Sequence, residues 1–524
     1  MPRYSYEPFT YRTPPELAGG VKSDAPVVII GAGPVGLAMA VDLALHGIKS
    51  IVLDDHDRVS VGSRAICWAK RTLEILDRLG VGERMVAKGV TWKVGRLFHG
   101  KDEVWSFDLL PEDGHKNPAF VNLQQYHVEH YLVERCADFF ELIDLRWKNR
   151  VTSVSQSAEC TEVAIETPDG SYQLQSDYLI VCDGARSPTR TMMGLDFEGR
   201  FFEERFLIAD VEMTIEQPSE RWFWFEPEFH PGQSALLHKQ PDNIYRIDLQ
   251  LGHDADPELE ATPERVIPRI QKAVGHSNFE LDWVSVYRFQ CRRLKRFVHE
   301  RIIFAGDSAH VVSPFGARGG NGGIQDVDNL GWKLAAVIKS EAMPALLESY
   351  NDERVHGSDE NIKNSSRTTK FMSPDSNIER LFRDEVLRLA KTMPFARLMI
   401  NSGRLSQPCV LTGFELQSEN PDAPLAVGSP CLDAPILLNG KAAYLLEQLG
   451  GDFVLLARGG AVPQVPQGVR ILNIERANAL VSARYGAGWT YLIRPDQHIA
   501  AAWKNPSTAD IATAYNRATG ANHG

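Results

Sequence analysis

The chain has 524 residues, of which 43% are hydrophobic and 24% are charged, a composition ordinary for a globular protein of two or three domains. Its 56 basic and 68 acidic residues give a formal net charge of −12, which argues against a nucleic-acid partner. No stretch approaches about 18 unbroken apolar residues, so no membrane span is expected. Seven cysteines with no C-x-x-C pair fit a reducing cytoplasm, without a disulfide framework, a zinc knuckle or another metal site.

The N-terminal part of the chain predicts a nucleotide-binding unit. Residues 1–24 lack the basic-then-apolar order of a signal peptide, so we expect an extension that lies on the first domain. A short apolar strand, 27–30, precedes a glycine turn, a helix over 37–46 and a second strand over 50–53 that ends in Asp54-Asp55. A strand, turn, helix and strand with an acid about 20 residues after the glycines is the usual order of a dinucleotide-binding fold.

The glycine turn carries the chemistry of this unit. Gly31 permits a tight bend, Gly33 lets the backbone approach a pyrophosphate, and Gly36 lets the helix pack closely on the strand. Pro34-Val35 lie within the glycine turn, and the N-terminal N–H groups of the helix that follows face the phosphates. Asp54, with Asp55 beside it, can accept both hydroxyls of an adenosine ribose and repels the 2′-phosphate of NADP. The site therefore suits FAD or NAD.

The rest of the chain divides into helical and sheet-like stretches. Helical spacing is present at 71–79, 128–140, 325–340 and 345–354, whereas the polar stretch 357–375 is expected to be irregular. Short strands are expected at 151–155, 161–166, 172–175, 178–181 and 301–305. Residues 205–290 alternate strongly and carry many aromatics, which predicts an antiparallel sheet with one buried face. Beyond 410, strands at 453–457, 469–474 and 490–493 and a closing helix at 509–518 indicate a separate domain.

Two further glycine-bearing segments follow buried strands. Asp183-Gly184 follows the strand at 178–181, and Gly306-Asp307 follows the strand at 301–305. An aspartate at a turn that enters a helix can accept hydrogen bonds from the ribityl chain of a flavin. Because NAD has no ribityl chain, the last of the three glycine segments favours FAD over NAD.

In this order, the three glycine segments and the residues between them resemble the single-component FAD-dependent aromatic hydroxylases, the class of the 4-hydroxybenzoate and phenol hydroxylases. The resemblance covers nearly the whole chain and is strongest to the branch of the phenol, resorcinol and 3-(3-hydroxyphenyl)propionate hydroxylases. It implies an α/β fold with a Rossmann-like FAD-binding domain over 25–200 and 285–405. An inserted antiparallel-sheet substrate domain over 201–284 and a thioredoxin-like C-terminal domain over 410–524 complete the expected architecture.

The resemblance assigns cofactor roles to residues outside the first turn. Arg64, in the Gly62–Ala65 segment, is expected to reach the FAD pyrophosphate, and Gln125 to lie near the flavin. Asp183-Gly184 is linked to both FAD and NAD(P)H, and Gly306-Asp307 to the ribityl chain. The N–H groups of the loop from Pro314 to Asn321 are expected to face the pyrimidine edge of the flavin and to favour negative charge there. The residues assigned to the cofactor in this loop are Pro314, Gly319, Gly320 and Asn321.

The C-terminal tail resembles the domain appended in the same branch, through Tyr485-Gly486 and the Tyr491–Asp496 segment. Redox-active thioredoxin-like domains use C-x-x-C, which this tail lacks. We therefore expect a redox-inert domain that supports dimerisation, as a homodimer, or folding.

The reaction that the resemblance implies belongs to aromatic-compound catabolism. NADH or NADPH binds transiently and reduces FAD, O₂ adds at flavin C4a, and the resulting hydroperoxide transfers OH to a small, electron-rich aromatic substrate. The protein must supply a dry pocket. It must also help to deprotonate the phenol, because a phenolate is the better nucleophile. The sequence leaves open the substituents of the ring and the choice between NADH and NADPH.

Candidate substrate residues lie in the aromatic-rich sheet. If 237–240 and 244–250 pair around the turn at Pro241, His238 and Arg246 face the same side. His238 would then take the phenol proton or hold an acidic group, and Arg246 would pair a carboxylate or approach the flavin. The alternative is that both are solvated sheet residues. The remaining candidates for the catalytic pocket are Tyr287, Gln290 and Pro314.

One departure from the enzymes that the chain resembles concerns the base. Phenol hydroxylases carry an acid just after the alanine that corresponds to Ala65, whereas Ile66 stands there in this chain. The group that deprotonates the substrate is therefore open.

Two alternative functions remain. Residues Trp222–Pro227 come near the W-x-W-x-I-P signature of flavin-dependent halogenases, although Glu226 stands where isoleucine belongs. The other alternative is a non-catalytic FAD-binding protein, which the intact Gly316–Asn321 loop disfavours.

Overall fold

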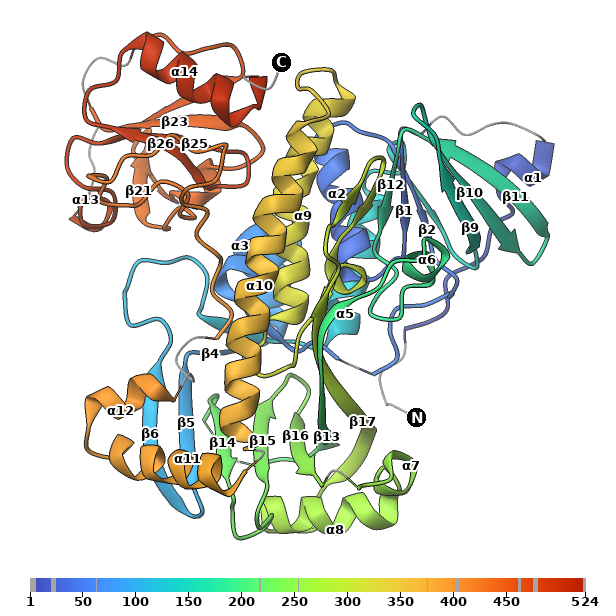
Figure 1. The fold of residues 1–524 in the computed structure, drawn as a ribbon, viewed down its shortest axis with the longest axis vertical. Helices are drawn as coiled ribbons and strands as arrows, with labels where there is room; N and C mark the ends of the chain where they lie inside the picture. Colours follow the sequence, from blue (N-terminus) through green and yellow to red (C-terminus); the bar gives the residue numbers. More distant parts are fainter. Residues whose placement is uncertain are drawn as a thin grey trace.

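The structure is a computed structural model that describes residues 6–19, 25–62, 64–215, 218–252, 254–374, 376–400, 405–459, 463–474 and 479–521. Two long helices, α9 (Gly319–Ile338) and α10 (Leu346–Met372), run side by side through the middle of the molecule (Figure 1). The N-terminal parallel sheet lies on one side of these helices, and the C-terminal part lies on the other (Figure 1). The large aromatic-rich sheet lies at the far end of α10 (Figure 1).

A six-stranded sheet forms the core of the N-terminal part. Its order is β18-β19-β12-β1-β2-β8, and all neighbours are parallel except β18 and β19. The strands are β18 (Val298–His299), β19 (Ile302–Phe304), β12 (Tyr178–Val181), β1 (Val27–Ile30), β2 (Ser50–Leu53) and β8 (Ile143–Arg146). The predicted strands and the helix α2 (Pro34–Leu45) are confirmed. The three glycine segments follow β1, β12 and β19, which are adjacent, so their turns meet at one edge of the sheet.

The predicted aromatic-rich sheet is larger than the sequence indicated. Its order is β20-β17-β13-β16-β15-β14-β5-β6. The strands are β20 (His310–Val311), β17 (Glu280–Arg293), β13 (Glu198–Glu212), β16 (Ile244–Leu251), β15 (Ser234–Lys239), β14 (Arg221–Phe225), β5 (Val94–His99) and β6 (Asp102–Asp108). Neighbours are antiparallel except β14 and β5. The strands β5 and β6 come from outside 201–284. They form a hairpin that pairs with β14 and so completes this edge of the sheet.

Two smaller sheets and several short helices complete this part. The strands expected in this region are present as β9 (Arg150–Gln156), β10 (Thr161–Thr167) and β11 (Gly170–Ser176), and they form an antiparallel sheet. The strands β3 (Cys67–Ala69), β7 (Phe120–Asn122) and β4 (Val90–Trp92) form the other. The helices are α1 (Pro15–Gly19), α3 (Lys70–Arg78), α4 (Gly82–Lys88), α5 (Gln125–Ala137), α6 (Pro188–Met192), α7 (Pro257–Glu260), α8 (Pro263–Val274), α11 (Asn377–Ala390) and α12 (Pro394–Met399). The N-terminal extension lies on this part, where Phe9 stacks on Trp147.

Different layers cover the two faces of the aromatic-rich sheet. One face packs against α8 through Val266 and Ile270. The other face carries several phenylalanines, and Phe371 near the end of α10 packs edge-on against Phe225. On this second face Phe315, from the loop before α9, packs against Phe206 at a ring separation of 4.9 Å. The face with the phenylalanines is therefore the one that meets the loop from Pro314 to Asn321, which we call the flavin loop after its predicted role.

One expectation about secondary structure is wrong. The polar stretch 357–375, expected to be irregular, largely belongs to α10, which continues to Met372. Its serines, asparagines and threonines have low intrinsic helix propensity. The helix forms because small and polar side chains are buried along one side at helical spacing. These are Gly357, Ser358, Asn361, Ser365 and Thr369. Packing of this stripe outweighs the local propensity.

The C-terminal part forms a separate sheet with its own core. Its strands are β23 (Phe453–Ala457), β24 (Val469–Asn473), β25 (Thr490–Ile493) and β26 (Ile499–Trp503), in the order β24-β23-β25-β26. The hairpin β21 (Pro435–Leu438) and β22 (Lys441–Tyr444), the 3₁₀ turn η3 (Leu446–Gln448) and the helices α13 (Ala479–Tyr485) and α14 (Thr508–Ala518) complete it. The predicted strands and closing helix are confirmed. Among the described residues, no helix is both long enough and apolar enough to cross a membrane.

A buried ionic network fastens the C-terminal part to the central helices. Arg494, just after β25, has a fully buried side chain and donates to Glu353 of α10 at 2.6 and 2.8 Å. The same guanidinium donates to Asp496 at 3.0 and 2.5 Å. Arg71 of α3 donates to Asp328 of α9 at 2.7 Å and to the carbonyl of Asp496 at 2.8 Å. The C-terminal part is thus tied to the helix whose first turn is a candidate flavin site.

Candidate functional site

The first glycine turn has the shape that its sequence predicted. Gly31 has a φ of 102°, and a Cβ there would overlap the backbone of Cys182 in the next glycine segment. A Cβ at Gly36 would overlap the carbonyl oxygen of Gly31, so α2 packs directly on the turn. A Cβ at Gly33 would meet no atom within 4 Å, so this backbone borders open space at the helix N-terminus. Open space beside unpaired helix N–H groups fits a pyrophosphate.

Asp54 is held rigidly at the end of β2. Its Oδ2 accepts the N–H of Ala32 at 2.6 Å, and its Oδ1 accepts the N–H of His56 at 2.9 Å. The imidazole of His56 lies 3.3 Å from Asp54 and 2.6 Å from Asp55, and the hydrogen bond with Asp54 raises the pKa of His56 to about 9. Oδ1 thus has both the N–H and the imidazole of His56 as partners, whereas Oδ2 keeps a lone pair with which the carboxylate can still accept a ribose hydroxyl.

The third glycine segment exposes one acid in buried surroundings. Asp307 lies in the turn η1 (Gly306–Ser308), where both of its neighbours are buried while its own side chain is exposed. Although the side chain keeps accessible surface, the protein around it shields the carboxyl from water and raises its pKa, and the charges of His310 and Arg64 oppose the shift. His310 has a structural partner, because its Nε2 lies 2.7 Å from Asp326, which also accepts the N–H of Gly306 at 2.9 Å. Asp307 is therefore the acid of this turn that is open to a ligand.

Gln125 acts on the segment that carries Arg64. Its Oε1 accepts the N–H of Ala65 at 3.1 Å, and its Nε2 donates to Glu129 at 2.8 Å. Glu129 in turn accepts the N–H and the hydroxyl of Ser60 at 2.6 and 2.7 Å. These bonds hold both ends of the segment, while the side chain of Arg64 is exposed and close enough to Asp307 for its charge to lower the pKa of that acid.

The loop before α9 presents its backbone rather than its amide side chain. Gly319 and Gly320 form the first turn of the helix, and a Cβ on Gly319 would have no atom nearer than 3.8 Å. The side chain of Asn321 is fully used, since it accepts the N–H of Ala69 at 2.9 Å and donates to the carbonyls of Cys67 and Ala317. Asn321 therefore braces the loop against β3, and Pro314 at its head is exposed.

The second glycine segment is ordered around its aspartate. Asp183 Oδ2 accepts the N–H of Thr189 at 3.0 Å, and burial raises the pKa of this carboxyl. Gly184 has a φ of 81° and would place a Cβ in open space. The segment thus borders the same edge of the parallel sheet as Gly31 and Asp307.

His238 and Arg246 lie opposite each other on β15 and β16, which confirms that they share a face. Arg246 is buried and already paired, because Asp210 accepts two hydrogen bonds from it at 2.8 and 2.7 Å. Burial, assisted by the charges of Arg221 and Arg246, keeps the pKa of His238 well below its usual value. His238 is therefore a neutral side chain, with Cys67 Sγ 3.8 Å from its Nδ1.

The two candidates on β17 point in opposite directions. Tyr287 packs with the apolar residues around Phe206, on the face toward the flavin loop. Between Trp283 and Cys291 the strand alternates regularly, so Gln290 faces the other side. Tyr287 can border the ring pocket, whereas Gln290 lies behind the strand.

Sequence reasoning missed several polar residues on the face toward the flavin loop. They are Cys67, Asp210, Arg221 and Asp248. Arg221 and Asp248 lie at polar positions of strands in which polar and apolar residues alternate. In the sequence, this pattern looks the same for a polar residue that faces a pocket and for one that faces solvent. Asp210 is revealed only by the pairing of β13 with β16.

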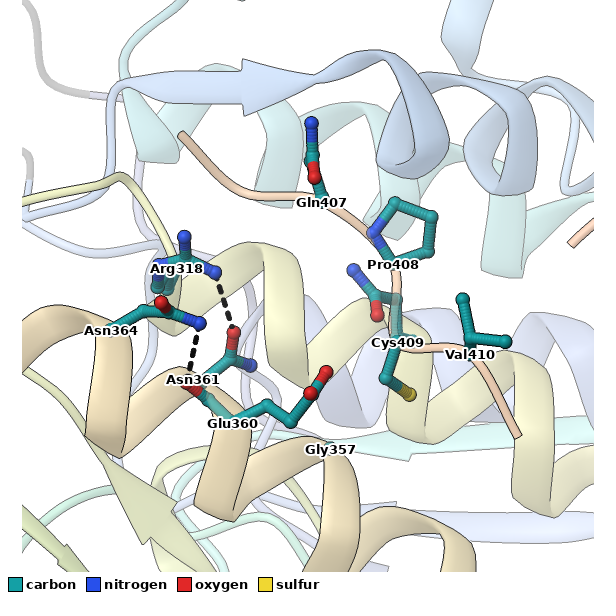
Figure 2. Close-up of a pocket in the computed structure, with 10 residues that line it drawn as sticks. Arg318, Gly357, Glu360, Asn361, Asn364, Gln407, Pro408, Cys409 and Val410 are labelled. Atoms are coloured by element: carbon teal, nitrogen blue, oxygen red, sulfur yellow. Dashed lines mark hydrogen bonds between the residues drawn. The ribbon is translucent and has the colours of Figure 1, made fainter. Parts of the chain in front are cut away.

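Two cavities adjoin the flavin loop, and they differ in chemistry. One is apolar and is bordered by Gly316, Arg221, Phe223, Phe225 and Met372. The other, of about 320 Å³, lies where α9, α10 and residues 407–410 meet (Figure 2). There Arg318 donates to Asn361 at 3.1 Å, with Glu360 and Asn364 nearby (Figure 2). Sites for small ligands are lined mainly by apolar and aromatic side chains with a few polar groups, so the cavity with the phenylalanines is the candidate ring pocket.

Comparisons with known proteins agree with this geometry. The model of a family described as FAD binding domain matches residues 24–365. A 3-(3-hydroxy-phenyl)propionate/3-hydroxycinnamic acid hydroxylase from Mycolicibacterium smegmatis is 27% identical over 82% of this chain and 76% of its own length. A para-nitrophenol 4-monooxygenase from a Pseudomonas species is 30% identical over 63% of this chain and 82% of its own length. The solved structure of the flavin-dependent monooxygenase PieE, in complex with FAD and substrate, has a TM-score of 0.79 at 20% identity over 95% of this chain and 100% of that one, a likeness of fold.

Proposed function

The chain belongs to the FAD binding domain family and is an FAD-dependent aromatic monooxygenase, and from this premise we propose that it hydroxylates a small phenol or a related ring with NAD(P)H and O₂. Its fold is the mixed α/β fold of FAD-binding hydroxylases. The observation that carries the proposal is the apolar cavity, which borders both the flavin loop at Gly316 and the aromatic-rich sheet. Relatives named for phenolic substrates support the same substrate class.

The residues present fit FAD along its length. Gly31, Gly33 and the N-terminus of α2 would hold the pyrophosphate, and Asp54 would hold the adenosine ribose. Arg64 would reach the phosphates, Asp307 the ribityl chain, and the first turn of α9 the pyrimidine edge. Bound FAD supplies the chemistry that this chain's own side chains lack, namely acceptance of a hydride and activation of O₂.

The surroundings of the ring pocket suit a phenol. Phenylalanines from β14 and the flavin loop exclude water, which protects the activated oxygen from loss as H₂O₂. Arg246, bound to Asp210, also reaches the carbonyl of Arg64 at 3.5 Å, and so links the sheet to the FAD-binding segment. We assign Arg246 to positioning, and His238 and Tyr287 to the sheet face that the pocket borders.

The domain boundaries follow from the same proposal. We place the FAD-binding domain at 25–200 and 285–405, with the substrate domain at 201–284 extended by β5 and β6. We propose that 410–524 is thioredoxin-like, supported by the order β24-β23-β25-β26, in which only the first pair is parallel. This domain has no C-x-x-C and would act in folding or in assembly of a homodimer.

A substrate screen tests the function. The FAD-loaded protein is mixed with NADH or NADPH and a panel of phenols, and nucleotide oxidation is measured together with product mass. At least one phenol should raise the oxidation rate above the substrate-free rate and should gain one oxygen atom. Stimulated oxidation that yields only H₂O₂ with every phenol, or a product that appears only with chloride present, would contradict the proposal.

A further inference from the structure

Two polar groups of the aromatic-rich sheet are buried without a partner. Among the described residues, Arg221 Nε and Asp248 Oδ1 are buried atoms that have no hydrogen-bond partner. Both side chains nevertheless keep some accessible surface, whereas the neighbouring His238 and Arg246 are only 3% and 2% exposed. A buried donor and a buried acceptor are costly to leave unpaired, so the two groups point to a ligand that offers one acceptor and one donor.

The register of the strands places both groups on one face. Phe223 pairs with Leu236, and Leu236 pairs with Asp248, so these residues form one row across β14, β15 and β16. Arg221 lies two positions before Phe223 and therefore points to the same face. On this face Arg221 borders the apolar cavity together with Gly316 of the flavin loop.

The other ionisable groups around this point are poor proton acceptors. Arg246 is neutralised by Asp210 through two hydrogen bonds. Burial raises the pKa of the Cys67 thiol to about 12, so this group stays protonated. Burial, together with the charges of Arg221 and Arg246, holds the pKa of His238 well below its usual value, which makes His238 a weak base.

Asp248 is the stronger base. Burial raises its pKa to about 6, the charges of Arg246 and Arg221 oppose the rise, and Asp210 reinforces it. At neutral pH the carboxylate is therefore mostly ionised, yet its pKa is close enough to neutrality for it to take up a proton during a reaction.

Resting on the proposed function, we propose that Asp248 accepts the proton of the substrate's ring hydroxyl and that Arg221 donates a hydrogen bond to the oxygen left behind. The O–H bond breaks, its proton moves to Asp248 Oδ1, and the electron pair stays on the ring oxygen as a phenolate. Arg221 remains protonated and stabilises the negative oxygen by a charge-assisted hydrogen bond. The step consumes no oxidant. Asp248 would thereby serve as the base in place of the acid that phenol hydroxylases carry at the position of Ile66.

The test compares five forms of the holoenzyme: wild type, Asp248→Asn, Arg221→Met, His238→Gln and Asp242→Asn. Asp242 is the matched control, because it lies in the exposed turn of the same hairpin and pairs with Lys88 at 2.7 Å. The probe is 4-nitrophenol, whose neutral and ionised forms differ in colour, and its ionisation is titrated while it is bound. The second readout is the pH profile of kcat/KM with the best phenol of the screen. FAD occupancy is measured in every form, so that loss of cofactor is not mistaken for loss of the base.

Wild type and Asp242→Asn should bind the probe as phenolate, and their kcat/KM should fall as pH drops through about 6, where Asp248 becomes protonated. Asp248→Asn should remove this acidic limb and lower kcat/KM by about 100-fold, within the usual range for a general base. Arg221→Met should raise the pKa of the bound probe by about one unit or more, as loss of a nearby opposite charge does.

Several results would overturn the assignment. They include a probe that titrates alike in all five forms, an acidic limb that persists in Asp248→Asn, and a limb that disappears in His238→Gln instead. A wild type that does not bind the probe, or leaves it neutral, also overturns it. Failure of the proposed function is distinct, because then no phenol stimulates NAD(P)H oxidation while the titration of the bound probe still reports on Arg221 and Asp248.

Discussion

Replacing Arg494 by methionine should destabilise the protein through the buried ionic network. The guanidinium is fully buried and donates to both oxygens of Glu353 and to both oxygens of Asp496. Methionine fills part of the space but leaves Glu353 with Lys333 at 2.8 Å and Asp496 with His498 at 3.4 Å. Removing one partner of a buried ion pair typically costs about 3–5 kcal/mol. That loss is a large share of the about 5–15 kcal/mol by which a typical domain is stable.

The effect should depend on pH in a defined direction. Although burial opposes it, Arg494 and Lys333 hold the pKa of Glu353 well below its usual value. The stability that this group contributes is present above the unfolded pKa of a glutamate and is lost as pH falls through the depressed folded pKa. Without Arg494 the folded pKa rises, so Glu353 is neutralised at higher pH in the variant. The deficit of the variant should therefore shrink between about pH 7.5 and pH 5.

Equilibrium urea unfolding of the holoenzyme measures the loss, followed by tryptophan fluorescence and by release of FAD. The control is Arg388→Met. The Arg388 side chain is 66% exposed, and among the described residues its ion-pair partner is Glu385 at 2.8 Å. An exposed pair contributes about 0–1 kcal/mol. A loss below about 1 kcal/mol for Arg494→Met, or a deficit that grows on acidification, would refute the reasoning.

Four further substitutions test the candidate FAD site and the ring pocket. Asp307→Ala should weaken FAD binding by about 10- to 100-fold, the worth of a hydrogen bond to a charged group, and full flavin occupancy after gel filtration would contradict this role. Arg64→Ala should raise the Kd for FAD more than it alters preference among phenols, as flavin fluorescence titration and the substrate panel would report. His238→Ala should increase the fraction of NAD(P)H lost as H₂O₂, because it would open a path for water on the sheet face that the pocket borders; unchanged coupling and rate would remove it from the site. Gly36→Ala places a methyl group on the carbonyl of Gly31, and we expect little FAD-bound protein, measured as the ratio of flavin to protein absorbance.

The sequence predicted the turns of the candidate FAD site, because a glycine turn depends mainly on residues that are close together in the chain. Gly31 and Gly36 act through backbone conformation and close packing, and the tight turn and the helix packed on it are present as predicted, while the roles of these glycines and of Asp54 toward FAD stay predictions. Gln125 shows where this reasoning ends. Its predicted nearness to the flavin stays a prediction, since its side chain is bound to Ala65 and Glu129 and acts through the segment that carries Arg64.

The length of α10 and the extent of the aromatic-rich sheet depend on tertiary contacts. The polar composition of 357–375 predicted an irregular stretch, but burial of Asn361, Ser365 and Thr369 makes most of the segment helical. The eight-stranded sheet includes β5 and β6 because strand pairing depends on long-range register, which no local pattern reveals.

The sequence by itself determined that this protein binds a dinucleotide through a βαβ unit, and its order of motifs favoured FAD. Which polar groups face the ring was decided only by the tertiary structure. Arg246 and Arg221 look alike as arginines on alternating strands, yet Asp210 from a third strand neutralises Arg246 and leaves Arg221 at the cavity. The physical reason is that a buried charge takes its chemistry from the groups that surround it, and here those groups come from strands far apart in the chain.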